Sequence, residues 1–259
     1  MKVPVTIITG FLGAGKTTLI RHLLENANGA RIAVIINEFG DLGIDKELLS
    51  GCEVDGCGDE NLLELANGCI CCTVADDFLP AMNKLLGRAE SPDHIIIETS
   101  GLALPKPLVK AFNWPEVKSR ATVDGVVAVV DSCAVHERRF AHDPVAVQNA
   151  REIDDALDHE APLEEVYEDQ LSCADIVLLN KKDLVGRDNL SIVKSEVKNK
   201  SNSQVKILSI KNGKIDPKIL LGIEAAAEKT IDLKKSHHNE EEEHDHDDFE
   251  SFVLNLEQT

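Results

Sequence analysis

The sequence is poor in aromatic side chains and contains no long uninterrupted apolar segment. Aromatic residues make up 3% of the 259 residues and hydrophobic residues 43%, so the core must consist mainly of Val, Ile, Leu and Ala. No apolar run approaches the roughly 20 residues that a membrane-spanning helix needs. Length and composition therefore predict one large α/β domain, or one domain with a fragment of another, that does not cross a membrane.

Basic residues are also scarce. The chain has 27 Lys and Arg against 46 Asp and Glu, which gives a formal net charge of -19. Because this charge repels phosphate backbones and anionic lipids, we expect no binding to nucleic acid or to a membrane surface. A strand pattern begins at Val3 and leaves no room for a signal peptide, so we expect a cytoplasmic protein.

Disulfide bonds are not expected among the seven cysteines, because cytoplasmic thiols are kept reduced. Five of the seven lie between Cys52 and Cys72. Such clustering in a reducing compartment indicates metal or redox chemistry.

Hydrophobic patterning predicts strands that alternate with helices. The expected strands are 3–9, 31–36, 94–97, 122–130, 176–179 and 205–207. The expected helices are 16–26, 61–66, 75–86, 103–112 and 163–173, with a Gly- and Asp-rich loop over 37–57. The alternation predicts an α/β domain over residues 1–231, with a mostly parallel sheet flanked by helices.

The C-terminal residues differ in composition from this domain. Residues 232–248 are rich in His and acidic residues, with eight acids between positions 240 and 250, and predict a disordered linker. Residues 249–259 begin with an alternating pattern that predicts a strand. Because one strand cannot form a sheet, we interpret it as the first strand of a C-terminal domain that is otherwise missing, or as a strand that must pair elsewhere.

A glycine-rich loop follows the first predicted strand. Residues 10–17 (GFLGAGKT) match G-x-x-x-x-G-K-[ST] between a strand and a helix, which is the context that a phosphate-binding loop requires. Backbone N–H groups and the helix N-terminus then face the phosphates, with Lys16 at the β- and γ-phosphates and the Thr17 hydroxyl on Mg²⁺. The expected nucleotide-binding residues here are Gly10, Gly13, Ala14, Gly15, Lys16, Thr17 and Thr18.

The segment NKKD at 180–183 follows a later predicted strand. The Asp183 carboxylate can accept two hydrogen bonds from the guanine edge, and adenine lacks that donor pair. We expect Asn180 to brace the loop and the stem of Lys181 to cover the purine face. Together with a phosphate-binding loop, this pattern favours GTP over ATP.

Acidic residues end two of the predicted strands or follow them directly. Glu98, in IIIETSG, is expected to hold Mg²⁺ directly or through water, with the Gly101 N–H sensing the γ-phosphate; an acid that caps the next turn is the alternative. Glu38, in NEFG, could contact Mg²⁺, a transported metal or the attacking water. The candidate catalytic residues are Lys16, Glu98 and Glu38, and the sequence assigns neither an arginine finger nor a catalytic glutamine, so we expect weak intrinsic hydrolysis that needs a trigger.

The densest thiol cluster is C-I-C-C at 69–72. Two or three of Cys69, Cys71 and Cys72 can face one cation in a turn, and thiolates suit Zn²⁺ and Cu⁺ while also accepting Co²⁺. No second C-x-x-C pair closes the site, which favours metal exchange over a permanent structural site. Buried inert thiols and a redox switch are the alternatives.

Other residues are possible accessory metal ligands. Cys52 and Cys57 either complete the thiolate site or are loop cysteines, whereas Cys133 and Cys173 are expected in the core. Four histidines interleave with the acids near the C-terminus and suit either a weak metal-collecting segment or a solvated linker. These histidines are His237, His238, His244 and His246.

Taken together, these motifs resemble the CobW family of P-loop metallochaperone GTPases. The matching segments are GFLGAGKTT at 10–18, NEFG at 37–40, CICC at 69–72, ETSGLA at 98–103, QLSCAD at 170–175 and NKKD at 180–183. The resemblance, which runs over about 3–208, implies a P-loop NTPase fold of the SIMIBI type and a C-terminal β-rich domain that is largely absent. Segments 64–78 and 138–171 are most similar to the cobalamin-biosynthesis branch.

That branch implies GTP- and Mg²⁺-dependent acquisition of Co²⁺ and its delivery to cobaltochelatase or another metal-insertion client of the corrin pathway. A zinc chaperone of the same family is the nearest alternative, since ligand types alone do not decide the metal. A small-molecule P-loop kinase would leave NKKD and CICC unexplained. A zinc-binding module without turnover is disfavoured by the intact Lys16, Thr17 and Glu98. The sequence does not predict the oligomeric state.

Overall fold

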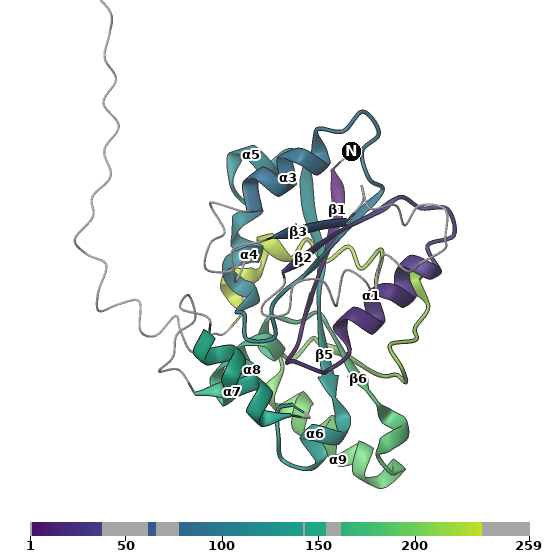
Figure 1. Cartoon of the computed structure of the whole chain (residues 1–259), viewed down its shortest axis with the longest axis vertical. Coiled ribbons are helices and arrows are strands. Elements are labelled where there is room, and N and C mark those ends of the chain that lie inside the picture. Colours follow the sequence, from purple (N-terminus) through teal and green to yellow (C-terminus); the bar gives the residue numbers. More distant parts are fainter. Residues whose placement is uncertain (1, 38–61, 66–77, 142, 154–161, 235–259) are drawn as a thin grey trace, which may run out of the picture.

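One parallel sheet with helices against both faces forms the part of the chain that the computed structural model describes, which is residues 2–37, 62–65, 78–141, 143–153 and 162–234 (Figure 1). Seven strands occur in this part, in the order β3-β2-β4-β1-β5-β6-β7, and every neighbouring pair is parallel. The strands are β1 (Val3–Thr9), β2 (Ile32–Asn37), β3 (Leu62–Leu65), β4 (His94–Glu98), β5 (Ala121–Asp131), β6 (Ile176–Asn180) and β7 (Lys206–Ser209). This is the α/β P-loop NTPase architecture predicted from the sequence.

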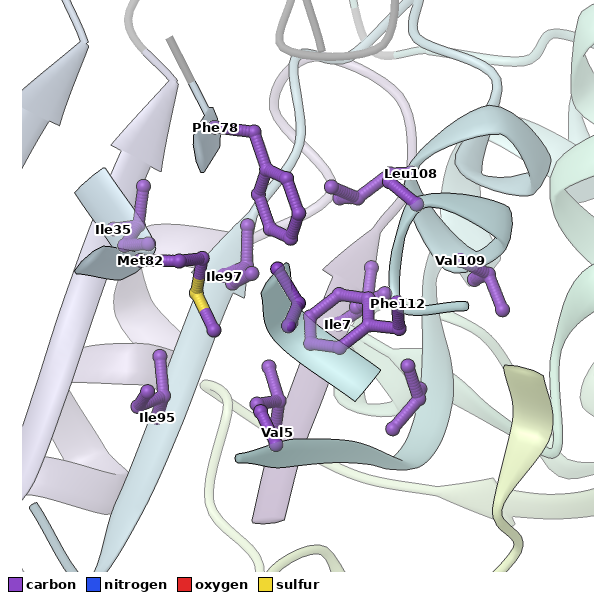
Figure 2. Close-up of a cluster of buried hydrophobic side chains, with 14 of the residues drawn as sticks. Val5, Ile7, Ile35, Phe78, Met82, Ile95, Ile97, Leu108, Val109 and Phe112 are labelled. Atoms are coloured by element: carbon purple, nitrogen blue, oxygen red, sulfur yellow. The ribbon is translucent and has the colours of Figure 1, made fainter. Parts of the chain in front are cut away.

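Aliphatic side chains of the strands alternate between two layers of helices. On one face, residues such as Ile7 and Ile97 pack with α3 (Leu79–Leu86) and α4 (Pro105–Ala111), as Figure 2 shows. On the other face, residues such as Ile8 pack against α1 (Lys16–Glu25). Because the inner strands are buried on both faces, they are continuous Val- and Ile-rich runs rather than alternating ones.

A third apolar cluster covers β5 and β6 with α8 (Leu163–Cys173) and α9 (Arg187–Lys200). The remaining helices described are α5 (Pro115–Lys118), α6 (Ser132–His136) and α7 (Pro144–Ile153), with single 3-10 turns η3 (Lys182–Leu184), η4 (Pro217–Ile219), η5 (Ala227–Lys229) and η6 (Ile231–Leu233). No helix in the described ranges is both long and apolar enough to span a bilayer.

The predicted helix at 61–66 is wrong, because β3 occupies Leu62–Leu65. This strand pairs with Val34–Asn37 of β2, and Leu63 packs against the core. Leu and Glu are good helix formers, but four residues are too few for periodicity to outweigh pairing with a distant strand. Leu65, the last residue of β3, lies opposite Asn37, at the carboxyl end of β2.

Of the two cysteines expected in the core, Cys173 is buried and burial raises the pKa of its thiol to about 11. Cys133 is half-buried on α6, so its assignment to the core is wrong. Position 133 follows Ser132 at the start of a short helix at the edge of the fold, where one side remains open to solvent.

Candidate nucleotide-binding site

The predicted nucleotide site gathers along the carboxyl edge of the sheet. Glu98 ends β4 and lies in register with Ile8 of β1 and Ile36 of β2. Further along the same edge, Asp131 ends β5 opposite Asn180 of β6. Ligands of open parallel sheets bind outside these carboxyl ends, so the topology places the separate motifs at one site.

The phosphate loop connects β1 to α1 in a conformation that requires glycine. Gly15 has φ of 102°, and a Cβ there would lie 2.4 Å from Asn180 Nδ2. That amide donates to the Ala14 carbonyl at 3.0 Å, and its Oδ1 accepts from the Gly213 N–H at 3.1 Å. Asn180 therefore joins the phosphate loop to the end of β6.

Lys16, Thr17 and Glu98 meet where α1 begins. The Lys16 ammonium donates to the Gly10 carbonyl at 2.9 Å and lies 4.0 Å from Glu98 Oε1. The Thr17 hydroxyl donates to the same Glu98 oxygen at 3.5 Å. Lys16 and Glu98 are both buried, so a cation, a carboxylate and a hydroxyl share a site that is largely shielded from solvent.

The turn after β4 lies against the phosphate loop. The Thr99 N–H donates to the Ile8 carbonyl at 3.0 Å. At Gly101, a Cβ would lie 2.7 Å from the Leu12 backbone nitrogen, so only glycine allows the two backbones to approach this closely. The structure thus places Gly101 beside the tip of the phosphate loop.

The NKKD segment occupies the carboxyl end of β6. Lys181 has φ of 59°, and its ammonium donates to Asp131 Oδ2 at 2.6 Å. Asp131 is buried and also caps α6 by accepting from the Cys133 and Ala134 N–H groups. Asp183, in η3, is exposed and pairs with Lys211 at 3.3 Å. The side chain proposed to select the base is therefore partly exposed and lies beside a cation.

Sequence reasoning missed Asp131, Lys211 and Gln170. Asp131 carries the signal that selected Glu98, an acid at the end of a buried apolar strand, and could have been found in that way. Lys211 comes two residues after β7 and has no local motif. Gln170 lies within QLSCAD and donates to the carbonyls of Gly101 and Ala103, a contact that requires the tertiary fold.

The residues present fit GTP and Mg²⁺. The glycine-lined loop, the buried ammonium of Lys16 and the N-terminus of α1 suit phosphate oxygens. Thr17 and Glu98 offer a hydroxyl and a carboxylate on one side of this loop, and Mg²⁺ prefers such oxygen ligands. Thr18, the remaining predicted residue of the loop, is exposed on α1.

Several predicted metal and catalytic residues lie outside the described part of the chain. These are Glu38, Cys52, Cys57, Cys69, Cys71, Cys72, His237, His238, His244 and His246; the linker and terminal strand predicted over 235–259 also lie there. Within the described ranges, no group of three or more His, Cys, Asp or Glu side chains is placed to hold a metal ion.

Comparison with known proteins identifies the family. The family model for "CobW/HypB/UreG, nucleotide-binding domain" matches residues 4–209. The chain is 56% identical over 259 residues to a protein from Sinorhizobium sp named "Zinc chaperone CobW", with 98% of this chain and 73% of that protein covered. A protein of the same name from Pseudomonas aeruginosa is 52% identical over 244 residues, which cover 93% of this chain and 65% of the relative.

A solved structure agrees with this result. The Zn(II)-bound YjiA GTPase from E. coli aligns with a TM-score of 0.57 and 26% identity, covering 86% of this chain and 62% of that protein. The chain thus spans between about 60% and three quarters of the length of these relatives. The matched model includes the phosphate loop, the acidic strand end and the NKKD segment described above. The chain therefore belongs to the CobW/HypB/UreG family of P-loop metallochaperone GTPases.

Proposed function

We propose that this chain binds and hydrolyses GTP in order to control a metal cargo held by the C-I-C-C segment at 69–72. The observation that carries the proposal is the meeting of Lys16, Thr17 and Glu98 at the start of α1. A cation, a hydroxyl and a carboxylate in this arrangement suit a nucleoside triphosphate with its Mg²⁺.

In the proposed reaction, Lys16 exchanges its bond to the Gly10 carbonyl for the β- and γ-phosphates and offsets their charge. Thr17 and Glu98 hold Mg²⁺, which when bound stabilises the charge that develops during phosphoryl transfer. Gly101 offers its N–H to the γ-phosphate, so release of phosphate frees the turn that follows β4. Glu38 remains a candidate for ordering the attacking water or for contacting a metal.

Base selection falls to Asp183. Its carboxylate accepts the N1–H and 2-amino groups of guanine, and the purine must displace or bypass the ammonium of Lys211. Asp131 holds Lys181 at the same edge of the sheet, where its stem can cover the purine. This assignment favours GTP over ATP.

The chain on either side of the thiols supports coupling between nucleotide and metal. Leu65 ends β3 opposite Asn37, at the carboxyl edge that carries Glu98. Figure 2 shows Phe78 beside Leu108 and Ile97, at the end of the apolar cluster away from Val5. The thiol segment therefore lies between the end of β3 and the start of α3, both near the nucleotide-binding edge, so a switch there can change the metal ligands.

Zn²⁺ is the cargo that we favour. Two similar proteins are named zinc chaperones, and thiolate-rich sites bind Zn²⁺ more tightly than Co²⁺. Co²⁺ is the second candidate, because the segments at 64–78 and 138–171 resemble the cobalamin-biosynthesis branch. With Co²⁺ as cargo, the client is cobaltochelatase or another metal-insertion partner of the corrin pathway. Cys52, Cys57 and the four C-terminal histidines are proposed accessory ligands. A cytoplasmic location is proposed because metal binding by thiolates requires cysteines that stay reduced.

Paired cysteine variants test the cargo site. We expect Cys71→Ser combined with Cys72→Ser to weaken Zn²⁺ binding at least about a hundredfold while GTP affinity changes less than about threefold. Cys133→Ser, which changes the half-buried thiol on α6, is the matched control and leaves both affinities unchanged. Unaltered Zn²⁺ binding by the double variant would remove the C-I-C-C segment from the proposal.

Product analysis separates this proposal from a P-loop kinase. With GTP and Mg²⁺ we expect GDP and inorganic phosphate in equal amounts. Transfer of the γ-phosphate to an added small molecule would support a kinase, and no turnover at any metal concentration would favour a binding module.

A further inference from the structure

Gln170 of α8 is a buried polar side chain that the proposed reaction does not use. It is 1% exposed, and its Nε2 lies 3.1 Å from the Gly101 carbonyl oxygen and 3.1 Å from the Ala103 carbonyl oxygen. The orientation of the amide follows from these partners, because a carbonyl can only accept and the NH₂ group has two hydrogens to donate. A reversed amide would set oxygen against both carbonyls.

Both acceptors belong to the turn that follows Glu98. Within this turn, the Ala103 N–H donates to the Ser100 carbonyl at 3.2 Å. Gln170 therefore fastens the turn at two points, one on either side of Leu102. Because each bond joins positions more than sixty residues apart, this contact sets the turn relative to α8 and not only its local shape.

The same helix also contacts the phosphate loop. Tyr167, one turn before Gln170, packs edge-on against Phe11 with ring centroids 5.9 Å apart. Phe11 is buried and precedes Leu12, whose backbone nitrogen limits the approach of Gly101. Gly101 is thus held between the phosphate loop on one side and Gln170 on the other.

We propose that Gln170 is a positioning residue for GTP hydrolysis, which fixes the Gly101 backbone at the distance from the phosphate loop that the transition state needs. This inference rests on the proposed function. Gln170 is bonded to the turn rather than placed for the nucleotide, so its loss should slow turnover more than it weakens GTP binding. Misplacing a reacting group by about 1 Å can lower a rate by roughly a hundredfold.

Two substitutions of similar size test this role. Gln170→Met keeps the side-chain volume but cannot donate, and Gln170→Glu sets a carboxylate against two carbonyls. We expect kcat to fall about tenfold in the first variant and further in the second, while the Kd for a fluorescent GTP analogue changes less than about threefold. Val197→Ala changes a buried residue of α9 in the apolar cluster that α9 shares with α8, and it is the control for lost stability. Below its unfolding temperature, this variant should keep the kcat of the unmodified protein.

The outcomes separate this inference from the proposed function. An unchanged kcat in both Gln170 variants overturns it, and so does a parallel loss of kcat and nucleotide affinity. If the unmodified protein does not hydrolyse GTP, the proposed function fails, and hydrogen exchange then tests whether Gln170 holds the turn after β4 against a bound nucleotide. A non-hydrolysable GTP analogue should then protect the amides of 99–103 in the unmodified protein and not in Gln170→Met; equal protection would overturn the role of Gln170.

Discussion

The buried polar groups at the amino ends of the strands (the amino edge) and at their carboxyl ends (the carboxyl edge) find hydrogen-bond partners in different ways. At the amino edge, Asp124 accepts the backbone N–H groups of Gly222, Ile223 and Glu224 at 2.7 to 3.0 Å. Nearby, Glu228 accepts the Thr122 hydroxyl at 2.6 Å and a backbone N–H at 3.0 Å. Residues late in the chain therefore pair with the polar groups at the start of β5, so these groups have hydrogen-bond partners within the protein.

At the carboxyl edge, Asp131 and Asn180 are paired within the protein, but other buried polar groups in the described ranges lack such partners. Within the described part of the chain, the buried hydroxyls of Thr9, Thr99 and Ser132 have no hydrogen-bond partner, and these residues end or follow β1, β4 and β5. A buried hydroxyl without a partner costs about 1–3 kcal/mol. The amino edge therefore stabilises the fold, while the carboxyl edge keeps some polar groups available for a ligand. Mutations at the amino edge should change the free energy of unfolding, and mutations at the carboxyl edge should change GTP affinity.

Lys16→Ala should show the largest effect at the carboxyl edge. It removes the buried ammonium beside the Gly10 carbonyl, and we expect GTP affinity to fall about a thousandfold, or about 4 kcal/mol, by isothermal titration. The free energy of unfolding of the nucleotide-free protein should change by less than about 1 kcal/mol. A large loss of stability with intact GTP binding would reverse the assignment of this edge.

Asp124→Ala is the matched change at the amino edge. It removes the buried carboxylate that accepts three partly buried N–H groups, so we expect the free energy of unfolding to fall by about 3 kcal/mol in urea denaturation. GTP affinity, measured where the variant is folded, should stay within about twofold. Loss of affinity without loss of stability would contradict a structural role for this edge.

Asp183→Asn sharpens the comparison by testing base specificity at the carboxyl edge. The amide keeps one acceptor but presents NH₂ to the guanine 2-amino group, so we expect GTP affinity to fall about a hundredfold. Xanthosine triphosphate, which has oxygen in place of that amine, should bind the variant better than GTP. Equal affinity of the variant and the unmodified protein for GTP would show that Asp183 does not contact the base.

Acid should lower the free energy of unfolding through His94, which lies at the amino edge. Burial lowers the pKa of His94 to about 4, opposed by the nearby Asp124 carboxylate, while its Nε2 lies 2.8 Å from the Thr6 hydroxyl. The folded state then favours neutral imidazole, so this contribution is complete above pH 6.5 and is lost as pH falls toward 4. We expect a slope of about 1.4 kcal/mol per pH unit in urea denaturation between these values.

His94→Gln is the control for that slope. It removes the titrating group at the start of β4 and should flatten the pH dependence between pH 6.5 and 4, although its stability at neutral pH is lower. An unchanged slope in this variant would assign the acid sensitivity to other groups.

Most of the fold and the nucleotide site could be predicted from the sequence. The bounds of β1 and α8 match the prediction to the residue, because long apolar runs and helical spacing are local signals. The phosphate loop and NKKD have fixed spacing, and both lie at strand ends where the fold brings them together. Their functional roles remain predictions.

Contacts between distant segments could not be predicted in this way. β3 is a strand only because Leu62–Leu65 pairs with β2, and its own residues suit a helix. The Lys181–Asp131 pair joins positions 50 residues apart in the sequence, and Gln170 donates to the carbonyl of Gly101, 69 residues away. Such pairs depend on which elements become neighbours, and one sequence carries no local signal for that.

The central claim is that the nucleotide bound at the carboxyl edge controls the affinity of the thiolate segment for metal. The most direct measurement is anaerobic titration of the reduced protein with Zn²⁺ and with Co²⁺, in Mg²⁺ buffer, with a non-hydrolysable GTP analogue, with GDP and without nucleotide. We expect thiolate charge-transfer bands of Co²⁺, and metal affinities that differ at least about tenfold between the GTP-analogue and GDP states. Equal affinities in all three states, or no thiolate bands, would contradict the account and leave a GTPase whose cysteines do not respond to its nucleotide.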